Sequence, residues 1–170
     1  MWYTSHLIAK IKSAIIKRVI SELKKKANKD PEDYAKFWDA FGAVLKEGIH
    51  EDFTNRDKIL EVCRFKSSES EKLISLDEYV SRMKDGQEKI YYVSGEDENK
   101  LSQSPHLEGF KAKGIEVIYM TDPVDEFWLP SVGKFSEKDF QSITKGGAEL
   151  DKIKSDKKSK DKKKENKNID

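Results

Sequence analysis

A serine-glycine corner after a strand-like run is the segment best suited to phosphate chemistry. Residues 90–93 lead into Ser94 and Gly95, and a helix-like stretch follows. Many α/β proteins bind a phosphate at such a corner, because the free amides at a helix start attract anions. Here the corner has a single glycine, and Glu96 and Asp97 stand where a polyphosphate would approach. Since carboxylates repel that ligand, we interpret the corner as a βα turn.

Histidine and cysteine could bind a metal or act in catalysis, but they lack partners at the required spacing. His6, His50 and His106 are far apart, and none has a second ligand at metal-binding distance in the sequence. We interpret His50 as a hydrogen-bonding loop residue. The lone Cys63 excludes an intramolecular disulfide and a cysteine-based zinc site, and is interpreted as a buried thiol. We therefore predict no catalytic, cofactor-binding or metal-binding residue in this chain.

Carboxylates and aromatics meet at a second candidate site near the end of the folded part. Asp122, Asp125 and Glu126 cluster at a predicted helix start, with Asp122 as the cap. A metal or acid-base role is conceivable, but caps and helix dipoles favour acids at this place in any case. Phe127 and Trp128 follow directly. Two large adjacent aromatics fit either a core or an exposed surface for a partner, and the residues alone leave both open.

Two successive helices are predicted for the first part of the chain. Between residues 5 and 27, apolar side chains recur at helical spacing and basic residues fill the other face. The apolar set is Leu7, Ile8, Ile11, Ile15, Ile16, Val19, Ile20 and Leu23. Asp30 can cap the next helix, and Pro31 fits its first position. Aromatic residues then share one face, and we expect Gly48 just beyond the helix end.

Short elements are predicted for the middle of the chain. A helix is expected over 55–64, and the polar residues 66–72 are expected to form a loop. Ser75 and Glu78 have the spacing of a capping box, in which each side chain bonds the other's backbone amide. This pair predicts a further helix over 76–83.

From residue 89 the pattern becomes that of an α/β protein. Strands are predicted over 89–94 and 115–121. Between them lie residues 102–113, in which Ser104 and Pro105 start a helix that Gly114 stops. Strand, helix and strand make a βαβ unit, which requires parallel strands and a right-handed crossover. Residues 139–144 are a predicted third strand, and a helix is predicted from Pro123. The fold class is therefore α/β, with a helical lobe first and a short, largely parallel sheet after it.

The charge of the chain differs between its body and its end. Residues 151–170 hold 9 lysines against 5 acidic residues and no aromatic, while the rest holds 24 basic and 27 acidic residues. Such a segment buries too little apolar surface to offset its ordering entropy, so we predict a disordered tail. Its interspersed acids argue against specific nucleic-acid binding. No apolar run approaches the roughly 20 residues of a membrane helix, so no membrane partner is expected.

Four long motifs make the sequence similar to a known family. They are residues 45–65, 75–96, 104–126 and 140–147, in this order and spacing. Together they resemble the middle domain of the ninety-kilodalton heat-shock chaperones, in particular the bacterial form, over roughly 7–150. The resemblance implies a helical linker lobe over 1–65, a small three-layer α/β/α lobe over 66–150, and the tail beyond.

The resemblance also implies what this chain does not carry. The family is an ATPase that binds ATP and Mg, but the segments similar to its nucleotide domain, larger middle lobe and dimerisation domain are not found here. The family's catalytic arginine and a nearby glutamine lie on a loop that would end at residues 1–6, which contain neither residue type. We therefore carry over no catalytic residue and expect no ATPase activity from this chain alone.

Protein binding is the activity that the resemblance does imply. Client or unfolded proteins are the expected partners, with other chaperone domains as further candidates, in the cytoplasm. The expected client-binding residues are Glu126, Phe127 and Trp128, and the apolar face from Leu7 to Leu23 is a second candidate. Two alternatives stay open: part of a split chaperone ATPase completed by another chain, or a remnant of a decayed gene.

Overall fold

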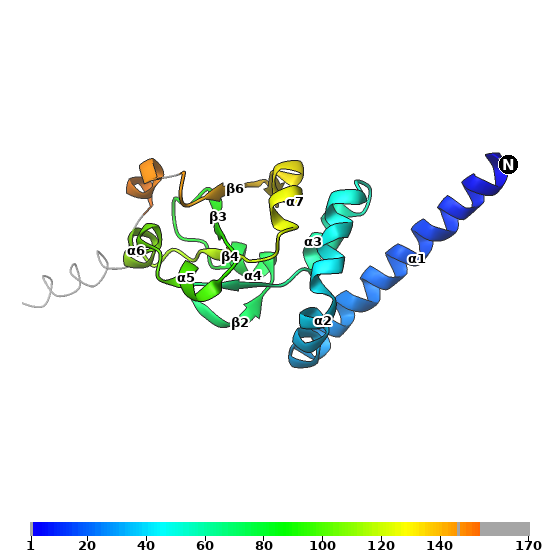
Figure 1. Ribbon diagram of the computed structural model, residues 1–170, viewed down its shortest axis with the longest axis horizontal. Helices are drawn as coiled ribbons and strands as arrows, with labels where there is room; N and C mark the ends of the chain where they lie inside the picture. The colour runs from blue at the N-terminus through cyan, green and yellow to red at the C-terminus, as the bar shows by residue number, and fades with distance from the viewer. Residues whose placement is uncertain (1, 146, 154–170) are drawn as a thin grey trace, which may run out of the picture. The chain divides into compact units, whose positions relative to one another are not determined.

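The computed structural model describes residues 2–145 and 147–153, and the predicted tail lies outside them from residue 154 onward. The chain divides into two compact units, residues 1–64 and 65–170. The first is helical and the second contains the whole sheet (Figure 1). Each unit is described by itself.

The first unit consists of three helices: α1 (Trp2–Lys29), α2 (Pro31–Glu51) and α3 (Arg56–Val62). The cap of α2 is the predicted one, since the Asp30 carboxylate accepts a hydrogen bond from the Asp33 amide at 3.0 Å and Pro31 occupies the first position. Within this unit, α1 extends well past its contact with the other two helices (Figure 1).

The predicted end of α2 is wrong by one turn. The helix continues through Gly48 to Glu51, and the Asp52 amide closes it by donating to the Gly48 carbonyl at 2.9 Å. Gly48 has a packing role instead: a Cβ there would stand 3.3 Å from the Ile59 Cδ1 atom of α3. His50 consequently lies in the last helical turn, not in a loop.

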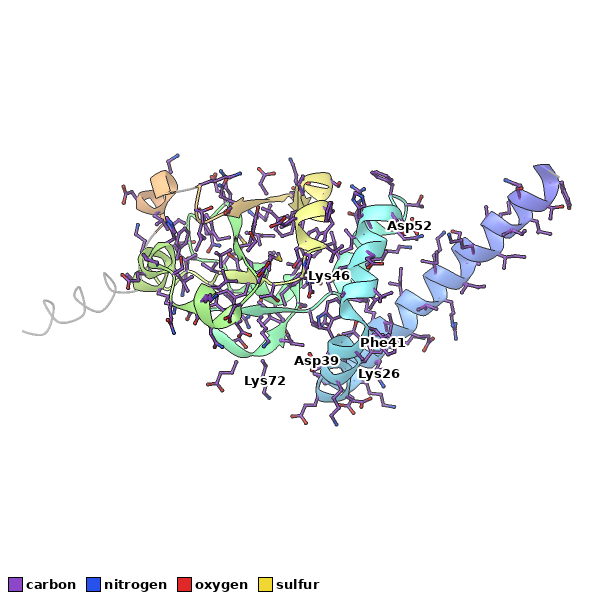
Figure 2. The ribbon with its side chains drawn as sticks, viewed as in Figure 1. Lys26, Asp39, Phe41, Lys46, Asp52 and Lys72 are labelled. Carbon is purple, nitrogen blue, oxygen red and sulfur yellow. The ribbon has the colours of Figure 1, made fainter. Side chains whose placement is uncertain are left out.

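Aromatic side chains of α2 supply much of the core of the first unit. Tyr34 and Trp38 are buried, and the Tyr34 hydroxyl donates to the Val62 carbonyl at 2.7 Å. Gly42 lets the Trp38 ring lie along the helix, because a Cβ there would come within 2.6 Å of the ring. Phe41, on the same helix, is 54% exposed (Figure 2).

The second unit is built on one six-stranded sheet in the order β2-β1-β4-β3-β6-β5. Its strands are β1 (Phe65–Ser67), β2 (Ser70–Ile74), β3 (Lys89–Ser94), β4 (Ile118–Met120), β5 (Lys134–Phe135) and β6 (Lys138–Ser142). Its helices are α4 (Leu76–Ser81), α5 (Glu98–Ser102), α6 (Pro105–Ala112) and α7 (Asp125–Val132), followed by a 3-10 helix, η1 (Gly147–Lys152).

The predicted βαβ unit forms the centre of this sheet. β3 pairs in parallel with β4, with Tyr92 opposite Ile118, and with β6, with Ile90 opposite Phe140. Both edges are antiparallel, so the sheet is mixed and the largely parallel prediction holds only for its centre. The α/β class and the three layers are confirmed. α5 and α6 pack on the sheet through Leu101, Leu107 and Phe110, which share a core cluster with Tyr91 and Val93 of β3. α7 packs through Trp128 on Phe65 of β1 and Phe140 of β6.

Two hairpins were not predicted. The segment expected to be a loop over 66–72 belongs to the β1–β2 hairpin instead. The polar side chains of β2 suit its position at the edge of the sheet. The hairpin of β5 and β6 turns through Ser136 and Glu137, which have φ values of 50° and 62°. Two positive φ values identify a type I′ turn, whose usual signature is Asn-Gly. Neither residue gives that signal.

The capping box is confirmed with both of its hydrogen bonds. The Ser75 hydroxyl accepts from the Glu78 amide at 3.1 Å, and the Glu78 carboxylate accepts from the Ser75 amide at 3.0 Å. At the other end of the unit, the predicted tail starts too early. Ile153 is 4% exposed and packs in the core cluster with Leu107, Phe110 and Ile115.

Candidate functional site

The α7 corner holds the three predicted client-binding residues and separates them by burial. Trp128 is fully buried, whereas Glu126 is exposed and Phe127 is 61% exposed. Adjacent residues of a helix point about 100° apart, so one can enter the core while its neighbour faces solvent. Trp128 is therefore a core residue, which corrects its assignment to a binding surface. Glu126 and Phe127 remain candidates.

A buried carboxylate fixes Trp128 in place. Asp125 is fully buried, and its carboxylate accepts from Trp128 Nε1 at 2.8 Å and from the Asp122 amide at 3.1 Å. The Trp128 ring packs edge-on against Phe140 of β6, with centroids 5.6 Å apart, and also contacts Phe65 of β1. The helix begins at Asp125, two residues after the predicted start, because residues 122–124 form a turn.

Phe127 thus lies exposed on a short helix whose buried side is anchored to the sheet by Trp128. Pro130 lies inside α7 and has no N–H to donate to the Glu126 carbonyl, while Gly133 ends the helix with φ of 68°. Sequence reasoning missed the anchoring role of Asp125. The spacing of Asp125 and Trp128, three apart on one helix face, is the signal that could have revealed it.

The Ser94-Gly95 corner is a structural turn, as interpreted from its charges. The Gly95 amide donates to the Met120 carbonyl at 3.1 Å, and a Cβ on Gly95 would lie 2.9 Å from Leu101. The Asp97 side chain caps α5 by accepting from the Asn99 amide at 2.9 Å. Glycine is needed for close packing here, and a carboxylate already occupies the helix start.

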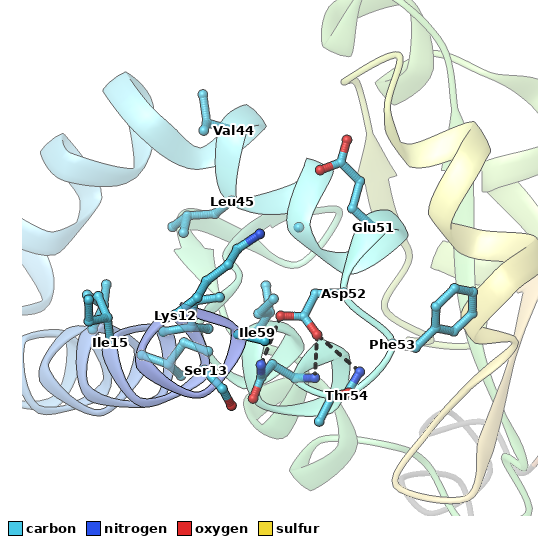
Figure 3. A pocket seen from close by; sticks show the side chains of 16 residues that line it. Lys12, Ser13, Ile15, Val44, Leu45, Glu51, Asp52, Phe53, Thr54 and Ile59 are labelled. Atoms are coloured by element: carbon cyan, nitrogen blue, oxygen red, sulfur yellow. Dashed lines mark hydrogen bonds between the residues drawn. The ribbon is translucent and has the colours of Figure 1, made fainter. Parts of the chain in front are cut away.

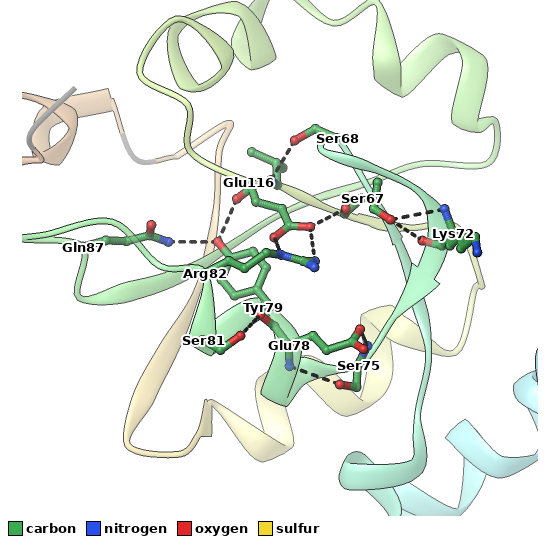
Figure 4. A network of polar contacts seen from close by, with 12 residues as sticks. Ser67, Ser68, Lys72, Ser75, Glu78, Tyr79, Ser81, Arg82, Gln87 and Glu116 are labelled. Atoms are coloured by element: carbon green, nitrogen blue, oxygen red, sulfur yellow. Dashed lines mark hydrogen bonds and ion pairs between the residues drawn. The ribbon is translucent and has the colours of Figure 1, made fainter. Parts of the chain in front are cut away.

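A polar network inside the second unit was not predicted (Figure 4). Glu116, 7% exposed, accepts from the Ser67 hydroxyl at 2.5 Å and from Arg82 at 2.9 and 3.1 Å. The hydrogen bond to Glu116 raises the pKa of Arg82. The Tyr79 hydroxyl donates to the Glu116 carbonyl at 2.8 Å and accepts from Gln87 and the Tyr91 amide.

This network is structural in character. Burial raises the pKa of Tyr79, so its hydroxyl remains a donor even at alkaline pH where an exposed tyrosine would ionise. Its members hydrogen-bond one another across α4, β3 and the segment before β4, which suits a role in holding these elements together. Within the described residues, no three or more histidine, cysteine or acidic side chains come together to hold a metal ion.

The second predicted binding surface, the apolar face of α1, is exposed. Its members Leu7, Ile8, Ile11, Ile15 and Val19 are 48–59% exposed. Beside it lies an open groove of about 700 Å³, which we call the α1–α2 groove (Figure 3). Its walls are Ile15, Ile16, Val19 and Ile20 of α1 and Val44 and Leu45 of α2, and Ile59 of α3 also lines it.

Polar residues line one part of this groove. The Asp52 carboxylate accepts from the Thr54 and Asn55 amides, each at 3.1 Å, and from Asn55 Nδ2 at 2.8 Å. These bonds, chiefly that from the Asn55 side chain, lower the pKa of Asp52. Lys12 of α1 also lines the groove (Figure 3). No local sequence signal predicts this groove, because Val44 of α2 and Phe53 of the loop after α2 are far from α1 in the sequence.

Comparison with known proteins decides the family. Residues 2–169 match the family described as Hsp90 protein. The chain belongs to the Hsp90 family. It is 58% identical over 146 residues to the chaperone protein HtpG of Roseobacter denitrificans, which covers 86% of this chain and 24% of that protein. It is 50% identical to HtpG of Paramagnetospirillum magneticum, over 92% of this chain and 25% of that protein.

The structural comparison places this Hsp90 chain in the middle domain, as the resemblance implied. It is similar to the middle domain of a heat shock protein of Plasmodium falciparum, with a TM-score of 0.77 and 33% identity, covering 84% of this chain and 60% of that one. The chain spans about a quarter of the length of the curated HtpG relatives it matches. Among the described residues, no helix combines the length and apolarity needed to cross a bilayer.

Proposed function

We propose that this Hsp90-family chain contributes client binding to a molecular chaperone, through Glu126 and Phe127 on α7, and performs no nucleotide chemistry itself. The observation that carries the proposal is the separation of two adjacent aromatics. Trp128 is fully buried and bonded to Asp125, while Phe127 is 61% exposed on the same helix. An exposed aromatic side chain is a natural anchor for a partner, since aromatics are enriched at protein interfaces. We further propose a reducing compartment such as the cytoplasm, with which the single, buried cysteine Cys63 is compatible.

The chemistry of the pair suits an unfolded client. The Phe127 ring offers apolar area to hydrophobic side chains that a folded protein would bury. Glu126 beside it favours clients with nearby cations and disfavours acidic ones. The apolar face of α1 is the second proposed client surface, with five large side chains about half exposed.

Suppression of aggregation tests the proposal. The full chain should reduce light scattering when chemically denatured citrate synthase is diluted into buffer, and Phe127→Ser should lose most of that effect. Phe41→Ser is the matched control, since Phe41 is similarly exposed on α2 and lies outside the proposed surface. Equal suppression by all three proteins would overturn the assignment of Phe127.

Calorimetry tests the absence of nucleotide chemistry. Titration of the full chain with Mg-ATP should give no binding heat. A saturable isotherm with micromolar affinity would contradict this part of the proposal.

A further inference from the structure

The exposed side of α7 combines an acidic side chain, an aromatic ring and a proline. Its members, which we call the α7 face, are Glu126, Phe127, Pro130 and Ser131. Pro130 follows Glu126 by four residues, so the two lie about 40° apart around the helix axis, and Phe127 lies roughly 60° beyond Pro130. The carboxylate, the ring and the proline therefore share one side of the helix.

Pro130 frees a main-chain acceptor on this face. In a regular α-helix the amide of residue i+4 donates to the carbonyl of residue i, but Pro130 has no N–H to give to the Glu126 carbonyl. The Ser131 hydroxyl donates to a different acceptor, the Phe127 carbonyl, at 3.3 Å. The Glu126 carbonyl thus lacks its helical donor on the side of α7 where the Glu126 carboxylate and the Phe127 ring also lie.

The charges around α7 favour a cationic donor for this acceptor. Residues 121–133 contain Asp122, Asp125 and Glu126 and no lysine, arginine or histidine. Asp125 is fully buried, which leaves Glu126 as the exposed carboxylate of the helix. The next cation along the chain, Lys134, lies beyond the helix end and pairs with Asp139 at 4.0 Å. A carboxylate, a carbonyl oxygen and the face of an aromatic ring all attract a cation.

We infer that the α7 face selects client segments in which an arginine or a lysine stands beside an apolar residue. The N–H groups of the cation donate to the carboxylate and the carbonyl of Glu126, and its stem lies on the Phe127 ring. The apolar neighbour packs against Phe127 and Pro130. Arginine is the preferred cation, because its planar guanidinium presents several donors and stacks on aromatic rings. The inference rests on the proposed client binding by Glu126 and Phe127, and it makes Pro130 a specificity-determining residue of that site.

A pair of labelled, unstructured peptides tests the inference by fluorescence anisotropy with the full chain. Both contain a leucine in a glycine-serine background; next to it, one has arginine and the other has citrulline, a neutral analogue of the same shape. The arginine peptide should bind about fivefold to tenfold more tightly, through one exposed ion pair and one cation–π contact. Added salt should reduce this ratio, because exposed charges are screened. Equal affinities of the two peptides would overturn the inference.

Two variants of α7 separate the carboxylate from the carbonyl. Glu126→Gln removes the charge and should reduce the ratio of affinities to roughly twofold. Pro130→Ala supplies an amide that occupies the Glu126 carbonyl, so it should lower the ratio by about half while the citrulline peptide binds as before. Alanine suits a helix interior better than proline, so this variant should fold at least as stably. An unchanged ratio in Glu126→Gln would overturn the site, and an unchanged ratio in Pro130→Ala would overturn the role of the carbonyl.

Glu108→Gln is the matched control for charge. It removes an exposed carboxylate from α6 and should leave the ratio of affinities unchanged. A ratio that falls as much in Glu108→Gln as in Glu126→Gln would mean that the peptides respond to the net charge of the chain, which would overturn the inference. Circular dichroism and urea unfolding establish that each variant is folded.

Phe127→Ser distinguishes this inference from the proposed function. It should abolish binding of both peptides, and a preference for arginine that survives it would place the cation site elsewhere and overturn the inference. If the two peptides bind equally or not at all, while Phe127→Ser still impairs suppression of citrate synthase aggregation, the inference fails and the proposed function stands. If Phe127→Ser impairs neither peptide binding nor suppression, both fail.

Discussion

The two units treat their large apolar side chains in opposite ways. Among the described residues, the strongly exposed large hydrophobics are Tyr3, Leu7, Ile8, Ile11, Ile15, Val19, Phe41, Val44 and Phe53 in the first unit, and only Phe127 in the second. The other described large apolar side chains of the second unit are buried or half-buried. Exposure is therefore a collective property of the helical unit and an exception in the sheet unit.

This contrast makes the exposure of Phe127 informative. A single exposed aromatic is ordinary on most proteins. Here it stands next to a fully buried tryptophan, on a helix anchored by a buried carboxylate, in a unit that otherwise closes its apolar surface. In the helical unit, by contrast, binding would come from the exposed apolar face of α1, which has many side chains. The predictions below test this contrast, beginning with the largest effect.

Substitution at Trp128 should have the largest effect on stability. Trp128→Ala removes a fully buried ring and leaves a cavity beside Phe65 and Phe140, so we expect a loss of about 3–5 kcal/mol. Phe127→Ala, one residue away, should change the free energy of unfolding by no more than roughly 0.5 kcal/mol. Urea unfolding followed by tyrosine fluorescence and circular dichroism measures both. Similar losses of stability in both variants would contradict the division into a core Trp128 and an exposed Phe127.

Removing one buried tyrosine hydroxyl from each unit compares the contribution of hydrogen bonding to their stability. Tyr79→Phe in the second unit leaves the Glu116 carbonyl, the Tyr91 amide and Gln87 without this partner, so we expect a loss of about 1–3 kcal/mol. Tyr34→Phe in the first unit removes one bond, to the Val62 carbonyl, and should cost about 1 kcal/mol. Thermal melts of the two variants measure which substitution destabilises the protein more. A larger loss for Tyr34→Phe would contradict the network's role.

Alkaline unfolding should depend on Tyr34. Burial raises its pKa from 10.0 to about 12, so the folded state holds the phenolic proton more tightly than the unfolded chain does. This contribution is complete below pH 10 and is lost as the pH rises toward 12. Tyr34→Phe should therefore flatten the fall in stability between pH 10 and 12. Urea titrations at several pH values measure the slope; an unchanged slope would show that Tyr34 ionises as readily when folded.

The smallest expected effect is a gain in stability at the β5–β6 turn. Ser136 and Glu137 hold positive φ values that suit Asn and Gly better. Ser136→Asn with Glu137→Gly should stabilise the second unit by about 1 kcal/mol, measured as a rise in the urea midpoint. Since both residues are exposed and no core contact changes, a decrease would mean that the turn differs from type I′.

The sequence predicts the parts of this fold that rest on strong local signals. Ser75 and Glu78 have the spacing of a capping box, which marks a helix start, and the run 89–94 is apolar enough to be a buried strand. The edge hairpins escape prediction because edge strands need no apolar pattern, and because Ser136 and Glu137 adopt a turn that their side chains do not favour.

Only part of the candidate site could be predicted, again because the local sequence signal is incomplete. Sequence and resemblance together point to 126–128, but the division between Phe127 and Trp128 depends on where an eight-residue helix meets β6 and β1. A helix of two turns carries too few residues to define a face by periodicity. The groove between α1 and α2 depends on residues that are far apart in the sequence, such as Ile15 and Val44, and has no local signature.

The most direct test of client binding is an NMR titration of the isotope-labelled full chain with permanently unfolded, reduced and carboxymethylated α-lactalbumin. We predict shifts or broadening at the Glu126 and Phe127 amides of α7 and along Leu7 to Val19 of α1, with Tyr79, Tyr91 and Val117 in the closed core unchanged. Unchanged signals of the Glu126 and Phe127 amides would contradict the account, if the chain suppresses aggregation in the light-scattering assay.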